Sequence, residues 1–171
     1  FLDPDAALRH IEALTSGVSR NAAILRALLP AMLGWFADAA DPDAGLLSFR
    51  QVSDALGTTP WYLRVLRDEG ATAERLARLL ATSRYLADLL ARAPETVALL
   101  ADDDELRPRG PDVLEGELLA VARRNDDWED AVAAARGLRR RELIRIACSD
   151  LLGLVEVNEV GRALSEVTAA T

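Results

Sequence analysis

Four consecutive carboxylates, Asp102 to Glu105, form the densest cluster of metal-binding side-chain types in the chain. A D-x-D pair such as Asp102 and Asp104 can hold magnesium when it lies on a strand behind a Gly-Ser turn that grips phosphate. Here a helical pattern precedes the pair, a proline-rich stretch follows it, and there is neither a strand pattern nor a Gly-Ser turn. The pattern therefore favours a solvated loop, and we predict no metal-binding residue.

The other residue types that carry chemistry are too few to form a familiar active site. His10 is the only histidine and Cys148 the only cysteine, and their separation does not indicate a zinc site. The chain has no lysine, no G-x-S-x-G turn and no glycine-rich phosphate loop. Cys148 lies in an apolar helical stretch, which favours a small buried side chain over a reactive thiol. We predict no catalytic or cofactor-binding residue and disfavour an independent small-molecule enzyme.

The charged residues that stand out lie on a long helix expected near the C-terminus. At about 100° per residue, Arg139 and Asp150 share a face with apolar side chains. Glu142 lies at the edge of that face, within ion-pair reach of Arg139, and Arg145 lies on an adjoining side. Charges among apolar residues are costly unless they are paired or covered. Two interpretations stay open: a solvated, charge-laced helix, or a face on which these four residues contact another domain.

Two adjacent aromatic residues follow a predicted helix start. Pro60 fixes the backbone for the first helical turn, and Trp61 and Tyr62 come directly after it. Leu63 and Leu66 continue toward the core at helical spacing. Trp61 and Tyr62 are therefore candidates for core residues or for anchors of a partner.

Helix start and stop signals recur along the chain, and no segment alternates with the period of two that strands need. Expected helices run from about 4 to 14, 19 to 28, 42 to 57, 60 to 70, 72 to 81, 84 to 93, 94 to 101, 113 to 124, 127 to 152 and from 156 onward, with Pro30 kinking or restarting the second. Residues 102–112 are the one long loop expected and a candidate sub-domain joint. The sequence predicts an all-α bundle of roughly eight to ten helices without a sheet, forming a single helical domain over 1–171.

Charge and composition exclude several partners. The net charge of -8 opposes binding to nucleic acid, and no run of 18 apolar residues indicates a membrane span. A single cysteine fits a reducing compartment, so a cytoplasmic location is expected. Because the chain opens on Phe1 and its only methionine is Met32, we expect a fragment of a longer protein.

Three blocks of sequence, taken in order, resemble one family. They are ADPDAGLLSFRQVSDALGTTPWYLRVLRDEG, AERLARLLATSRYLADLLARAPETVALL and LRRRELIRIACSDLLGL. Together they resemble the start of the second half of the bifunctional glutamine synthetase adenylyltransferase, or adenylyl-removing enzyme, of the actinobacterial type. The resemblance covers nearly the whole chain, and a composition rich in Arg, Ala and Leu without lysine fits a GC-rich genome of that kind.

The resemblance implies a parent enzyme with two nucleotidyltransferase domains that use ATP and magnesium. One domain attaches AMP to a tyrosine of glutamine synthetase and the other removes it, in the control of nitrogen assimilation. The Gly-Ser and D-x-D motif of the second domain is expected after Thr171, so no catalytic role passes to any residue here.

The resemblance further implies that this chain is the central linker and regulatory region of that enzyme. Its implied partners are the flanking nucleotidyltransferase domains, together with glutamine synthetase, the signal protein PII and glutamine. The alternative is a helical interaction module that docks glutamine synthetase or a signalling protein without allosteric work.

Overall fold

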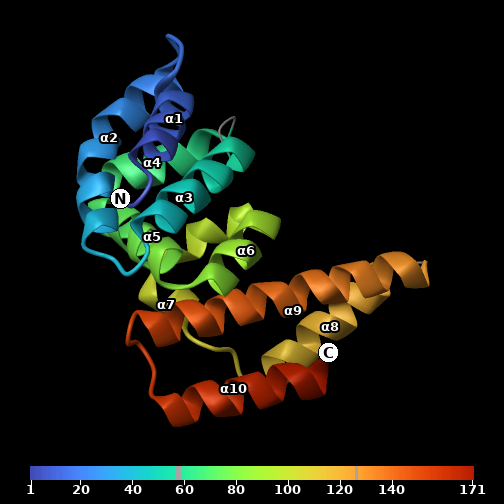
Figure 1. Ribbon diagram of the computed structural model, residues 1–171. Helices are drawn as coiled ribbons and strands as arrows, with labels where there is room; N and C mark the ends of the chain where they lie inside the picture. Colours follow the sequence, from blue (N-terminus) through green and yellow to red (C-terminus); the bar gives the residue numbers. More distant parts are fainter. Residues whose placement is uncertain (57–58, 126) are drawn as a thin grey trace. The chain divides into compact units, whose positions relative to one another are not determined.

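The computed structural model describes residues 1–56, 59–125 and 127–171, and over these ranges it contains helices and no strand. This confirms the predicted all-α fold. In chain order the elements are α1 Pro4–Thr15, α2 Arg20–Ala37, α3 Pro42–Leu56, α4 Pro60–Asp68, α5 Gly70–Thr82, α6 Arg84–Arg92, the 3-10 helix η1 Pro94–Ala101, α7 Asp103–Leu106, α8 Pro111–Arg124, α9 Trp128–Leu151 and α10 Val157–Ala170 (Figure 1). None of these helices is both long and apolar enough to cross a membrane.

Local capping chemistry explains where several helices begin. Asp3, Ser19 and Ser83 each accept a hydrogen bond from the backbone N–H three residues later, at 2.9, 3.1 and 3.2 Å. Each bond satisfies one of the N–H groups that the first helical turn leaves without a partner. The helix starts expected near residues 4, 19 and 84 are confirmed.

Three local predictions are wrong, and each has a physical reason. Pro30 does not restart the helix, because α2 continues through it with Pro30 on the exposed side and Met32 and Phe36 buried on the opposite side. A kink at Pro30 stays a prediction. The helix expected from 60 to 70 ends earlier, at Asp68: only Glu69 separates α4 from α5, so Gly70 is already the first residue of α5. Within the expected loop 102–112, α7 forms because Asp102 Oδ1 accepts a hydrogen bond from the Asp104 N–H at 2.9 Å. The predicted helix end at Gly57 lies outside the described residues.

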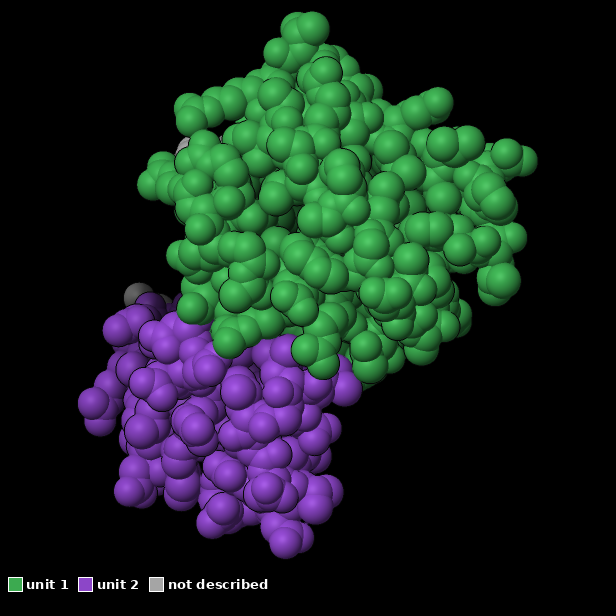
Figure 2. All heavy atoms as spheres, turned by 90° about the vertical axis from the view of Figure 1, so that its left-hand side faces the viewer, with its two compact units in different colours: residues 1–101 green, residues 102–171 purple. Residues whose placement is uncertain are grey.

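The chain divides into two compact units, residues 1–101 and 102–171 (Figure 2). The division falls next to the stretch 102–112, which the sequence marks as a candidate joint. A single helical domain spanning 1–171 stays a prediction.

In unit 1 (residues 1–101), α3 packs against α1, α2, α5 and α6. Phe36 and Phe49 form a tilted ring pair with centroids 6.1 Å apart, and both side chains are fully buried. Gly45 lies in this core, where an added Cβ would come within 2.7 Å of Ala81 Cβ and 2.8 Å of Phe36 Cδ1. The close approach of α3 and α5 therefore requires glycine at this position.

We expect Gly45→Ala to lower the free energy of unfolding by ~1–3 kcal/mol, the usual cost of overpacking a core. The clash must outweigh the gain in helix propensity of up to ~1 kcal/mol that alanine brings. Urea denaturation followed by circular dichroism measures the change. Gly34→Ala is the matched control, since Gly34 lies within α2 and a Cβ there meets nothing within 4 Å. A Gly45→Ala protein as stable as Gly34→Ala would contradict this close contact.

In unit 2 (residues 102–171), α8, α9 and α10 pack against one another, and α7 packs against α9. Their shared core contains Leu114, Ile146, Ala163 and Val167. Cys148 is fully buried, and burial raises the pKa of its thiol to about 12. This agrees with the prediction of a small buried side chain.

Candidate functional site: a buried charge cluster and two grooves

Two oppositely charged residues of α9 are almost completely buried in unit 2. Glu142 and Arg145 each expose 1% of their surface, and Arg145 Nε lies 3.4 Å from Glu142 Oε1. Arg109 lies in the segment between α7 and α8, and its Nε is 3.8 Å from Glu142 Oε1. Arg109 also forms an ion pair with Glu117 of α8. Arg145 Nη1 also lies 3.7 Å from Glu105 Oε2 on α7. These five residues form the buried charge cluster, which is named for Glu142 and Arg145 and links α7, α8 and α9. Glu105 at its edge is 55% exposed.

The cluster is electrostatically attractive but poorly satisfied by hydrogen bonds. Within the described residues, neither carboxylate oxygen of Glu142 accepts a hydrogen bond, and Nε and Nη2 of Arg145 donate none. Burial raises the pKa of Glu142 and lowers that of Arg145, because both charged forms lose hydration and the neighbouring charges offset that loss only in part. A buried pair of this kind contributes little net stability, yet removing one member leaves the other charge stranded.

The structure brings only two of the four candidate interdomain residues together. Glu142 pairs with Arg145 and not with Arg139, the partner that the sequence suggested. Arg139 Nη1 instead donates a hydrogen bond to Thr171 Oγ1 at 2.7 Å, and Asp150 is exposed near the end of α9. The role of these residues in contacting another domain stays a prediction.

Sequence reasoning missed three members of the buried charge cluster: Glu105, Arg109 and Glu117. Glu105 and Arg109 lie in the stretch 102–112, where the sequence predicts a loop, and Glu117 carries no distinguishing pattern. The i, i+3 spacing of Glu142 and Arg145 was visible in the sequence and was the available signal.

The two candidate aromatic residues differ in burial. Tyr62 is fully buried, and its hydroxyl lies 3.0 Å from Ser53 Oγ in a hydrogen bond. Burial strongly raises the pKa of the Tyr62 hydroxyl. Trp61 is only half-buried and packs edge-on against Tyr62, with ring centroids 6.1 Å apart. Tyr62 is therefore a core residue, and anchoring of a partner by Trp61 stays a prediction.

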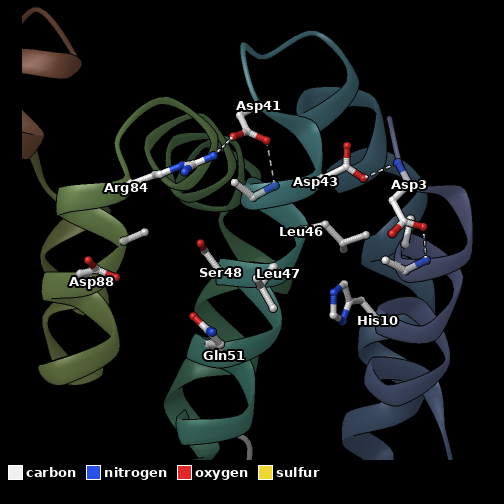
Figure 3. A pocket seen from close by; sticks show the side chains of 14 residues that line it. Asp3, His10, Asp41, Asp43, Leu46, Leu47, Ser48, Gln51, Arg84 and Asp88 are labelled. Carbon is white, nitrogen blue, oxygen red and sulfur yellow. Dashed lines mark hydrogen bonds and ion pairs between the residues drawn. The ribbon is translucent and has the colours of Figure 1, made fainter.

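An open groove of about 530 Å³ lies between α1, α3 and α6 in unit 1 (Figure 3). Arg84 donates a hydrogen bond to Asp41 Oδ2 at 2.8 Å and lowers the pKa of that carboxyl. Asp43 accepts a hydrogen bond from the Leu2 N–H at 2.7 Å. His10 points into the groove from α1, and its Nδ1 lies 3.1 Å from Arg50 Nη1. Most of the charged groups of this groove are thus already paired with other groups of unit 1.

The D-x-D pair, Asp102 and Asp104, makes local contacts around α7. Asp102 caps α7, and Asp104 lies 4.0 Å from Arg107 Nε. In the described part of the chain, no group of three or more His, Cys, Asp or Glu side chains is placed to hold a metal ion.

A second groove, of about 610 Å³, lies between α8, α9 and α10 in unit 2. Its walls are mostly apolar and rich in alanine, and two glutamates, Glu115 and Glu166, lie among them. Such a surface suits contact with another helix better than small-molecule chemistry, which needs converging polar groups.

Comparison with known proteins shows the family to which this chain belongs. The family model for glutamate-ammonia ligase adenylyltransferase matches residues 73–171. The chain therefore belongs to the glutamate-ammonia ligase adenylyltransferase family, as the resemblance implied.

Its relatives carry a more particular name. A bifunctional glutamine synthetase adenylyltransferase/adenylyl-removing enzyme from Streptomyces coelicolor is 59% identical over 100% of this chain. Proteins of the same name from Cutibacterium acnes and Mycobacterium tuberculosis H37Rv are 58% and 48% identical over 100% and 98% of the chain. The chain spans only 19%, 17% and 17% of the length of these three relatives.

Proposed function

We propose that this chain is a non-catalytic linker and regulatory region of an enzyme that attaches AMP to glutamine synthetase and removes it. Its family membership and its share of the relatives' length support this reading. In the proposal, two nucleotidyltransferase domains elsewhere in the enzyme bind ATP and magnesium in the cytoplasm. This chain couples those domains, and glutamine and the signal protein PII bias which of them works.

The structural observation that carries the proposal is the contrast between the two ends of α9. This helix has 24 residues and is about 36 Å long at 1.5 Å per residue. Near its C-terminal end, Glu142 and Arg145 are buried among α7 and α8. Near its N-terminal end, Trp128 is 70% exposed and Val132 is 38% exposed.

A helix that is fixed at one end and apolar and uncovered at the other is suited to coupling. A domain that packs on Trp128 and Val132 would shift α9 or hold it in place. The other end of α9 is packed within unit 2, so the helix would transmit that change. Coupling of this kind needs two arrangements of similar energy that an effector favours unequally. The exposed end of α9 supplies the surface on which such arrangements can differ.

We expect the isolated chain neither to transfer AMP to glutamine synthetase nor to remove it, with ATP and magnesium present. The physical reason is that Asp102 and Asp104 cap and flank the short helix α7, so they are not held on a strand beside a phosphate-binding turn. Incorporation of radiolabelled AMP measures transfer, and its release measures removal. Turnover above the blank that disappears in Asp102→Asn/Asp104→Asn would show that the chain is catalytic and would refute the proposal.

A further inference from the structure

The apolar groove of unit 2 is lined by residues from α8, α9 and α10. The lining residues include Leu118 and Ala122 of α8, Ala131 and Ala135 of α9, and Ala169 of α10. Pairs such as Leu118 and Ala122, or Ala131 and Ala135, are four residues apart and form ridges along their helices. Because alanine is small, the three helices leave a trough into which the ridge of one more helix can pack.

The apolar surface continues beyond the groove along α9. Trp128 lies three residues before Ala131 and seven before Ala135, so it shares their face of the helix. Leu119 lines the groove from α8 and is 49% exposed, and Trp128 is 70% exposed. A fourth helix lying along this trough would cover these side chains and complete a four-helix bundle.

Two carboxylates define the charge that the occupant must carry. Glu115 lines the groove on α8 and Glu166 lines it on α10. Within the described residues, neither side chain forms a hydrogen bond or an ion pair. Basic residues flanking the apolar face of the occupant would meet these carboxylates, whereas acidic residues would be repelled.

We propose that this groove binds a basic amphipathic helix supplied by another part of the same enzyme. The inference rests on the proposed function in that it treats this chain as part of a longer polypeptide. In the relatives, more than four fifths of the polypeptide lies outside the matched stretch, since the chain covers 17–19% of their length. A tethered helix binds at an effective concentration of about millimolar, so a groove of modest size suffices. A second copy of this chain is a poor occupant, because two chains of net charge -8 repel each other.

Photo-crosslinking in the complete natural protein that carries this sequence tests the inference. A benzoylphenylalanine replaces Leu119 in the groove, and in the control protein it replaces Leu164, which is 41% exposed on α10 and does not line the groove. After irradiation, gel mobility distinguishes links within one polypeptide from links between molecules, and mass spectrometry locates the linked peptide. A third protein combines the probe at position 119 with Glu115→Arg/Glu166→Arg.

We expect position 119 to crosslink, within one polypeptide, to a helical segment that lies outside residues 1–171 and carries Arg or Lys beside an apolar face. Position 164 should not reach that segment, and the double charge reversal should lower the yield at least about tenfold. A link only to residues 1–171, to a second copy, to another protein or to an acidic segment would overturn the inference, as would no link at all. Because the crosslink reports docking and not activity, its failure can be told apart from a failure of effector coupling.

Discussion

Arg145→Ala should lower the free energy of unfolding by ~3–5 kcal/mol, the typical cost of removing one member of a buried ion pair. The substitution leaves Glu142, which exposes 1% of its surface, with Arg109 Nε at 3.8 Å as its nearest cation. The loss should be visible in urea denaturation followed by circular dichroism, and hydrogen exchange should place it in α7 to α10.

Two further variants test whether the loss in Arg145→Ala comes from the unpaired charge of Glu142 or from the loss of packed side-chain atoms. Arg84→Ala removes an exposed pair with Asp41, so it should change stability little. Glu142→Leu/Arg145→Met removes both buried charges and should recover most of the stability lost in Arg145→Ala. If Arg145→Ala were as mild as Arg84→Ala, the cluster would not be buried in solution.

The buried charge cluster should also change how the stability of the protein depends on pH. Because burial raises the pKa of Glu142, the folded protein binds that proton more tightly than the unfolded chain, whose value is near 4.5. The contribution of Glu142 to stability is therefore present below pH 4.5 and is lost as the pH rises through the folded pKa. Glu142→Gln should remove this decline from the measured profile.

Tyr62→Ala should cost ~3–5 kcal/mol, because it empties a fully buried aromatic site. Part of this cost comes from the Ser53 hydroxyl, which loses its hydrogen-bond partner. Tyr62→Phe isolates that part and should cost ~1 kcal/mol. Thermal and urea denaturation of the three proteins measure these differences.

Trp61→Ala is the neighbouring comparison and should cost less than Tyr62→Ala, because Trp61 is only half-buried. Equal losses would show that both residues belong to the core. A Trp61→Ala protein that melts like the parent and loses binding to glutamine synthetase would instead make Trp61 a partner anchor.

Most of the fold could be predicted because its helix boundaries depend on local chemistry. Asp3, Ser19 and Ser83 cap helices through contacts with residues three positions away, which a sequence displays directly. The helix restart expected at Pro30 is wrong. Whether the helix continues through Pro30 depends on which side of α2 is buried, and that is a tertiary property. The helix α7 is too short for its periodicity to be recognised.

The candidate site was harder to predict because it depends on tertiary packing and not on local sequence. Helical periodicity placed Arg139, Glu142 and Asp150 close to one face but could not show which end of that face is covered. Glu142 lies 3.8 Å from Arg109, which is 33 positions earlier in the sequence and was expected in a loop. Only the packing of α7 and α8 against α9 brings these charges together.

In the proposed function, this chain couples two activities without performing either. The most direct test replaces residues 1–171, in the complete enzyme, with a flexible Gly-Ser linker long enough to keep the flanking domains joined. AMP attachment to glutamine synthetase and AMP removal are then measured across a range of glutamine concentrations, for this protein and for the unaltered enzyme. We expect both reactions to persist and their opposite responses to glutamine to disappear. Loss of either reaction while the flanking domains stay folded, or an unchanged response to glutamine, would contradict the account.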